Sequence, residues 1–266
     1  MATPKVILIT GGSSGLGQAM CRRLAEAGHL VVGTARKPEG APANYTLQAM
    51  DITDEASVQQ AVEAVIARHG RIDVLINNAG IGIQGPAEDI PADLGQRLFD
   101  ANFFGLHRVC RAVLPGMRGR KSGLIINISS IAANFGLPYR AFYSASKAAV
   151  DRYSEALSIE LRPFNVKVVV VQPGEFNTAI ANNRLRPATI SEAYAKSYAR
   201  AMEVLGGSMH DSRDPDELAV VVARIINDPA PALVYRVAQG MQKLSVLLKK
   251  LLPGRRFERM VGKHYE

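Results

Sequence analysis

The sequence predicts a single α/β domain with a parallel sheet that is covered by helices on both faces. Short, almost wholly apolar segments such as Lys5–Thr10 and Lys167–Gln172 are typical of strands buried on both sides. Segments with helical periodicity alternate with them along the chain, and this alternation favours a doubly wound parallel sheet. With 266 residues and a hydrophobic fraction of 47 %, the chain can form one large core.

The first strand is followed at once by a glycine-rich turn, Thr10-Gly-Gly-Ser-Ser-Gly-Leu-Gly17, and then by a helical pattern over Gln18–Ala27 that Gly28 closes. Glycines let the backbone approach a pyrophosphate, and a helix N-terminus offers free N–H groups. This context predicts a Rossmann-type dinucleotide site; a plain tight turn is the alternative.

The second strand, His29–Ala35, leads to Arg36, and no carboxylate follows before Glu39. In dinucleotide folds an acidic residue near this point binds the ribose of NAD, whereas an arginine accommodates the 2′-phosphate of NADP. The sequence therefore favours NADP(H). The alternative is a solvated loop arginine.

The alternation of strands and helices continues to the C-terminal third. We expect strands at 45–50, 73–76, 123–128 and 167–172, and helices at 54–69, 91–117, 142–161 and 215–227. No internal repeat, linker or low-complexity stretch interrupts residues 1–266, so we expect one domain.

Tyr143 and Lys147 lie one turn apart on the same face of the helix expected at 142–161. An isolated tyrosine has a pKa of about 10, and a cation within ~4–6 Å lowers that pKa. Such a pair suits proton transfer, but it also arises by chance, so its weight depends on the other motifs.

Together these motifs resemble the short-chain dehydrogenase/reductase family, in its oxidoreductase branch of roughly 250 residues. The resemblance covers about residues 5–180 and is carried, in order, by the glycine-rich turn, Asn-Asn-Ala-Gly at 77–80, Ser130, Tyr143-x-x-x-Lys147 and Pro173-Gly174. The epimerase-type relatives and the enoyl reductases fit less well, because their glycine or Tyr–Lys spacing differs.

The resemblance implies roles for four catalytic residues. Tyr143 would be the general acid in carbonyl reduction and the general base in alcohol oxidation, and Lys147 would lower its pKa and hold the nicotinamide ribose. Ser130, rather than Ser129, would bond the substrate oxygen, and Asn102 would hold a water of the proton relay. The implied coenzyme residues are Gly11, Ser13, Ser14, Gly15, Leu16, Gly17, Arg36, Asp51, Ile52, Asn78, Ala79, Gly80, Tyr143, Lys147, Pro173, Gly174 and Thr178.

A substrate loop or lid is expected at about 175–214, and it begins with a departure from the family pattern. Asn177 stands where the family more often has an apolar residue, which weakens the coenzyme role of Thr178. Glu175 either points into the substrate cleft or is solvated. Apolar residues farther on in this stretch favour core or lid packing over recognition; they are Leu185, Ile190, Tyr194, Tyr198, Met202, Val204 and Leu205.

The C-terminal segment, about 240–266, is basic and amphipathic. Residues 243–266 carry seven basic side chains against Glu258 and Glu266, which is +5 of the net charge of +8. Five leucines recur at helical spacing: Leu244, Leu247, Leu248, Leu251 and Leu252. This helix could close the core, cover a lipophilic cleft, dimerise or rest on a membrane surface. We expect a loose peripheral attraction to anionic membranes.

Composition excludes several other classes. Only Cys21 and Cys110 are present, which argues against a metal site or a disulfide scaffold and suits the cytoplasm. The sequence reaches its first strand too early for a signal peptide, and it has no run of about 18 apolar residues. Because the charge surplus lies in the tail, nucleic-acid binding is not expected.

We therefore expect an NADP(H)-dependent oxidoreductase, a homodimer or homotetramer, that interconverts a bulky apolar ketone or aldehyde and an alcohol. Steroid-, retinoid- and lipid-like substrates all suit it. The alternative is a non-catalytic protein that senses nucleotide or binds a lipid surface, but such a protein has no need for a complete proton relay.

Overall fold

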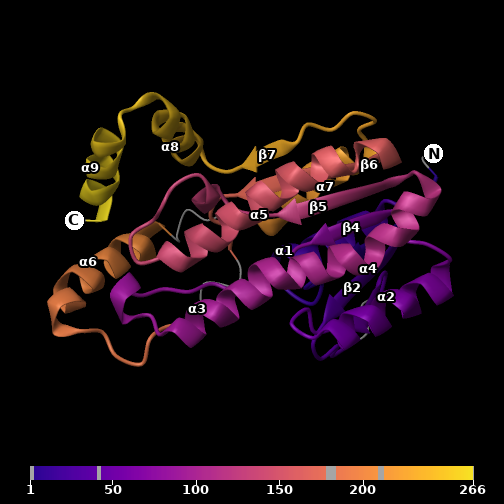
Figure 1. Cartoon of the computed structure of the whole chain (residues 1–266), viewed down its shortest axis with the longest axis horizontal. Helices are drawn as coiled ribbons and strands as arrows, with labels where there is room; N and C mark the ends of the chain where they lie inside the picture. Colours follow the sequence, from indigo (N-terminus) through magenta and orange to yellow (C-terminus); the bar gives the residue numbers. More distant parts are fainter. Residues whose placement is uncertain (1–2, 41–42, 178–183, 209–212, 266) are drawn as a thin grey trace.

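A computed structural model describes residues 3–40, 43–177, 184–208 and 213–265, so Thr178 lies outside the described residues. At its centre is a parallel sheet of seven strands in the order β3-β2-β1-β4-β5-β6-β7 (Figure 1). The strands are β1 Val6–Ile9, β2 Leu30–Ala35, β3 Thr46–Ala49, β4 Val74–Asn77, β5 Gly123–Ile128, β6 Val166–Pro173 and β7 Val234–Val237.

The sheet is doubly wound, as the sequence predicts. Helices α1 (Gly15–Glu26) and α7 (Pro215–Asn227) pack against one face through one apolar cluster. Helices α2 (Glu55–His69), α4 (Gly105–Arg120) and α5 (Ala141–Glu160) cover the other face through a second cluster. The central strands β1, β4, β5 and β6 are therefore buried on both sides, which explains their apolar sequences, whereas the edge strands β3 and β7 are only partly buried.

Local sequence sets the ends of several helices. The side chain of Asp54 accepts hydrogen bonds from the N–H groups of Ala56 and Ser57, so it caps α2. Gly70 ends that helix in the left-handed conformation, with φ of 80°. The side chain of Asp214 caps α7 in the same way as Asp54 caps α2.

The helix expected at 91–117 is present but interrupted. It comprises α3 (Ala92–Phe99), a π-helical turn at Asp100–Phe104 and α4. Helical periodicity over 91–117 does not reveal this turn, because the apolar pattern continues through it. A π-turn holds one extra residue per turn, and such turns are frequent at functional sites.

Three helices extend beyond the carboxyl ends of the strands, at the left in Figure 1: α6 (Glu192–Ser208), α8 (Gly240–Leu251) and α9 (Gly254–Tyr265). The leucine stripe of α8 does not close the core, because Leu244, Leu247 and Leu251 stay exposed. The core-closing alternative is therefore wrong for these residues; α8 instead packs through Val246. Within the described part of the chain, no helix is long and apolar enough to cross a membrane.

A buried polar chain ties α5 to the middle of the sheet. The side-chain amide of Asn77 on β4 donates to Asn127 on β5 at 2.9 Å. The amide of Asn127 in turn donates to the hydroxyl of Ser154 on α5 at 2.8 Å. All three residues are buried, so each depends on the next to satisfy its polar atoms.

Replacing Ser154 with alanine should therefore destabilise the fold. The substitution leaves the buried amide of Asn127 without its acceptor, at a cost of about 1–3 kcal/mol in the free energy of unfolding. Urea titration measures this loss, and Ser158→Ala, one turn along the same helix and only half-buried, is the matched control. An unchanged unfolding midpoint for Ser154→Ala would show that the polar chain contributes nothing to stability.

Candidate active site

The turn between β1 and α1 is so tightly packed at its glycines that no side chain fits there. Gly11 and Gly15 adopt positive φ angles of 68° and 53°, which favour glycine. A Cβ atom on Gly17 would lie 1.9 Å from the carbonyl oxygen of Gly11, and one on Gly12 would lie 2.6 Å from the Cα of Gly33. Any larger side chain would displace the turn or the neighbouring strand.

The N-terminus of α1 is open to an anion. Ser14 is its N-cap but makes no side-chain capping bond, and the first turn contains no acidic residue. The N–H groups of this turn, with the positive end of the helix dipole, point to the carboxyl edge of the sheet. Ser13 and Ser14 are both exposed there. This cradle fits the pyrophosphate of a dinucleotide.

Asn78 supports the cradle from the neighbouring strand. Its side-chain amide donates to the carbonyl oxygens of Thr10 at 2.9 Å and Gly11 at 3.2 Å. The hydroxyl of Thr10 accepts from the N–H groups of Asn78 and Ala79, each at 2.9 Å. The segment after β4 and the turn after β1 therefore hold each other in place.

Arg36 and Asp51 lie at the next part of the same edge, after β2 and β3. Burial alone would raise the pKa of Asp51, but hydrogen bonds from Thr53 and the nearby charges of Arg36 and Arg108 leave it below its ordinary value. Arg36 is exposed beside an ionised carboxylate. Its guanidinium group is therefore accessible to a ligand at the edge of the cradle.

Tyr143 and Lys147 face each other on α5. The Nζ atom of Lys147 lies 5.9 Å from the centre of the Tyr143 ring and donates to the carbonyl oxygen of Ile128 at 3.0 Å. Lys147 is only 6 % exposed. A buried ammonium group acts through a low dielectric medium, so its effect on nearby charge is stronger than in water.

Asn102 lies against this pair, on the π-turn between α3 and α4, and is 1 % exposed. Its side chain exchanges two hydrogen bonds with the backbone of Ile81, at 2.8 and 3.0 Å, and donates to Ser146 on α5 at 3.2 Å. A Cβ on Gly80 would meet both Asn102 Oδ1, at 3.0 Å, and Lys147 Nζ, at 3.7 Å. The structure thus brings Asn102, Gly80 and Lys147 together.

The two serines after β5 have different environments. Ser129 is buried and its hydroxyl donates to the carbonyl oxygen of Lys147 at 3.2 Å. Ser130 is half-buried and accepts from the N–H of Ala132 at 3.1 Å. Ser130 is the more accessible of the two to a substrate.

The structure also forms part of the expected coenzyme site at the end that would hold the carboxamide group of the nicotinamide. Pro173 ends β6, and the N–H of Gly174 donates to the carbonyl oxygen of Val237 at 2.9 Å. A Cβ on Gly174 would lie 2.0 Å from Gln242 Oε1, so α8 packs directly on this segment. Ile52, expected beside Asp51 in the coenzyme site, has its side chain over Gly105 at the start of α4.

A charged group lies near Tyr143, and of its members only Glu175 stands out in the sequence. Arg140 forms an ion pair with Glu175 at 3.8 Å, and the side chain of Arg140 is largely buried. Burial and the charge of Arg140 lower the pKa of Arg184 to about 10, against the opposing influence of Tyr143 and Glu175. Glu175 is therefore paired rather than freely solvated. No local sequence pattern marks this group, because its members come from three separate segments.

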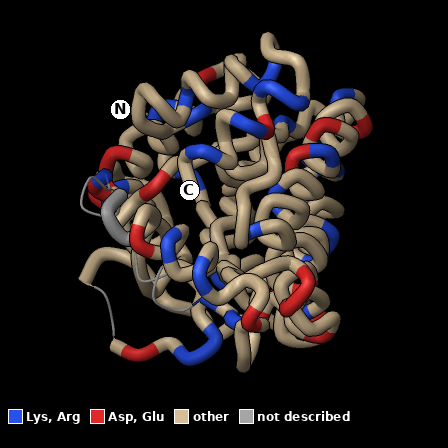
Figure 2. Tube along the Cα trace, turned by 90° about the vertical axis from the view of Figure 1, so that its left-hand side faces the viewer, with Lys and Arg blue, Asp and Glu red and all other residues tan. Residues whose placement is uncertain are grey.

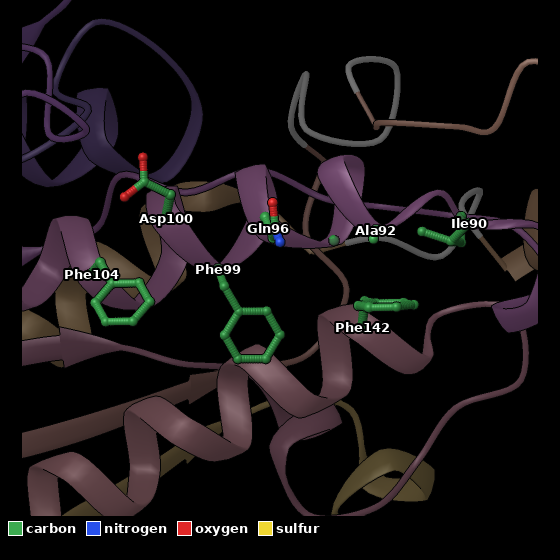
Figure 3. A pocket seen from close by; sticks show the side chains of 8 residues that line it. Ile90, Ala92, Gln96, Phe99, Asp100, Phe104 and Phe142 are labelled. Atoms are coloured by element: carbon green, nitrogen blue, oxygen red, sulfur yellow. The ribbon is translucent and has the colours of Figure 1, made fainter.

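A separate apolar hollow of about 580 Å³ lies between α3, the π-turn and the start of α5 (Figure 3). In the figure the rings of Phe99, Phe104 and Phe142 lie on one side of the α3 ribbon. Asn102, Ser130, Tyr143 and Lys147 do not line the hollow, so it is not the catalytic cleft. Its lining residues are Ile90, Ala92, Gly95, Gln96, Phe99, Asp100, Phe104 and Phe142.

Comparison with known proteins indicates, over most of the chain, the same family that the sequence motifs resemble. Residues 5–188 match the family model described as short chain dehydrogenase. A 3-ketodihydrosphingosine reductase from Bacteroides thetaiotaomicron is 43 % identical over 256 residues, which is 94 % of each chain.

Solved structures with a similar fold indicate the same family. A short-chain dehydrogenase from Streptomyces avermitilis has a TM-score of 0.83 at 32 % identity, covering 94 % of this chain and 93 % of that one. A 3-ketoacyl-(acyl-carrier-protein) reductase from Brucella melitensis, complexed with NADH, has a TM-score of 0.75 at 29 % identity, covering 90 % and 98 %.

Proposed function

The chain belongs to the short-chain dehydrogenase family and is an oxidoreductase that acts on carbonyl or alcohol groups; we propose that it reduces a long-chain ketone with NADPH. The observation that carries the chemistry is the buried ammonium group of Lys147 beside Tyr143, next to a cradle that fits a dinucleotide. Burying an ammonium group costs stability, and buried charges of this kind are concentrated at functional sites, which favours a catalytic over a non-catalytic protein.

In this proposal each residue has one task. The bound coenzyme supplies the hydride. Tyr143 donates the proton to the substrate oxygen, and Ser130 donates a hydrogen bond to the same oxygen as negative charge develops there. The nearby ammonium group of Lys147 stabilises the negative charge that is left on Tyr143 after it gives up its proton. Asn102 keeps the π-turn against Gly80 and α5, where a relay of protons to solvent would begin.

We propose a 3-ketodihydrosphingosine-like substrate, a ketone close to a polar head on a long alkyl chain. The support is the likeness to the reductase named above, which extends over nearly the whole of both chains. Arg140, Glu175 and Arg184 supply polar groups near Tyr143 for the head of such a molecule. Steroid- and retinoid-like ketones remain the competing apolar substrates.

The first prediction concerns coenzyme choice. NADPH should bind at least tenfold more tightly than NADH, because Arg36 forms charge-assisted bonds with the 2′-phosphate, each worth about 1.5–3 kcal/mol. Arg36→Asp should erase or reverse the preference, and Lys37→Asp, the same charge change one position along, should change it less. Fluorescence titration gives both dissociation constants. Equal constants in the unmodified protein would rule out the role of Arg36.

The second prediction tests the reaction and its substrate together. NADPH oxidation should be fastest with 3-ketodihydrosphingosine among ketones of graded chain length, and Tyr143→Phe should lower turnover by about 10²-fold or more. Lys147→Ala should lower turnover and weaken coenzyme binding, because one ammonium group serves both tasks.

Tyr153→Phe, about ten residues farther along α5, is the matched control and should keep normal turnover. Near-normal turnover of Tyr143→Phe would disprove the catalytic assignment. Turnover of small ketones alone would leave the chemistry intact but reject the long-chain substrate.

The third prediction concerns assembly. We propose a homodimer or homotetramer formed through the hollow between α3 and α5, where Phe104 is 49 % exposed beside Phe99 and Phe142. Phe104→Asp should shift the protein to a smaller species in light scattering, whereas Ile66→Asp, on an exposed position of α2, should not. A monomeric unmodified protein, or an unchanged mass for Phe104→Asp, would contradict this interface.

A further inference from the structure

Helix α8 presents an apolar face to solvent. Met241, Leu244, Leu247 and Leu251 are 75, 41, 51 and 69 % exposed. They account for four of the eight exposed large hydrophobic residues in the described part of the chain, although α8 has only 12 residues. Isolated exposed apolar residues are common on protein surfaces, but such a concentration on one helix marks an interaction site.

The exposed face lies opposite the side that anchors α8 to the domain. Val246 is buried and packs with Ile131 and Ala238. At 3.6 residues per turn, the four exposed side chains cover an arc of about 120° that is centred away from Val246. The domain therefore holds α8 by one side and leaves the apolar side free.

Basic side chains border this apolar face. Lys243 and Lys250 are exposed on α8, at one margin of the arc. The following helix, α9, packs inward through Phe257 and Tyr265, while Arg256 and Lys263 are exposed on its outer side. In Figure 2 the C-terminus, where α9 ends, faces the viewer, and Lys and Arg positions are blue along the Cα trace.

We propose that the outer faces of α8 and α9 dock on an anionic lipid bilayer, with α8 lying in the plane of the membrane interface. An apolar stripe enters the boundary between headgroups and acyl chains, and adjacent lysines and arginines contact anionic headgroups. Below, "docking face" means Met241, Leu244, Leu247 and Leu251 with the basic residues Lys243, Lys250, Arg256, Arg259 and Lys263.

A second copy of this chain is a poorer occupant. A two-fold contact through the docking face would bring two equally basic faces together in one interface. Like charges at close range oppose association, whereas an anionic bilayer neutralises them. The charge of the docking face thus selects the membrane over self-association.

Docking would also bring the catalytic cleft close to the bilayer, an advantage that rests on the proposed long-chain substrate. Val246, on the inner side of α8, contacts Ile131, the residue after Ser130. On the same helix, Gln242 packs on Gly174. Helix α9 packs on α6, the helix within the expected substrate lid.

The test is sedimentation of the full chain with vesicles, at low and at high salt. The protein should sediment with vesicles of equal parts phosphatidylglycerol and phosphatidylcholine, less so at high salt, and hardly at all with phosphatidylcholine alone. Leu247→Ser/Leu251→Ser should weaken binding by about tenfold or more, because each leucine loses apolar contact with lipid. Arg256→Glu/Lys263→Glu should abolish the dependence on anionic lipid.

Two matched controls separate this surface from general apolar or basic character. Ile66→Ser/Ile159→Ser removes exposed apolar residues elsewhere, and Arg68→Glu/Arg224→Glu makes the same charge change elsewhere; both should bind vesicles normally. NADPH binding by every variant shows that the fold is intact, and the vesicle result does not depend on the substrate.

Failure of the intact protein to bind anionic vesicles at low salt would overturn the proposal. So would leucine variants that bind as before. A fall in mass of the Leu247→Ser/Leu251→Ser protein in light scattering, without vesicle binding by the unmodified chain, would assign the face to a second copy instead.

Discussion

The buried ammonium group of Lys147 is the constraint on which the site depends. Removing a charge from water is unfavourable unless hydrogen bonds and opposite charge compensate for it. The carbonyl oxygen of Ile128, at the end of β5, supplies one such bond and fixes α5 relative to the sheet edge. The hydroxyl of Ser129 bonds the backbone of Lys147 itself, and Asn102 reaches α5 through Ser146. The position of Tyr143 therefore follows from contacts made by three separate segments.

The sequence predicted the sheet, the nucleotide cradle and the Tyr143–Lys147 pair because each depends on local pattern. Such patterns can be recognised without tertiary contacts: apolar strands, glycines where a turn needs positive φ, and a spacing of four on a helix. The π-turn at Asn102, β7 and α9 escaped prediction. The apolar periodicity continues through the π-turn, so it predicts an unbroken helix. Strand β7 has only four residues, two of them polar or aromatic.

Tertiary context explains the remaining differences. Arg140, Glu175 and Arg184 are brought together by the fold, so no spacing along the chain could reveal them. The buried Nε of Arg140 has no hydrogen-bond partner among the described residues. An unsatisfied guanidinium nitrogen next to a paired carboxylate leaves this end of the cleft able to accept another polar group.

The leucine spacing in α8 predicts an amphipathic helix, but periodicity alone does not show which side of the helix faces the protein. Burial of Val246, on the opposite side from the exposed leucines, decides the matter. Because Val246 contacts Ile131 next to Ser130, the same small cluster orients the docking face and supports the serine expected at the substrate oxygen. Under the proposed docking, this packed connection would give a bilayer on α8 a defined position relative to the cleft. An enzyme that takes an alkyl chain from a membrane needs that fixed geometry, since a mobile tail would hold the protein near the lipid without aligning its cleft.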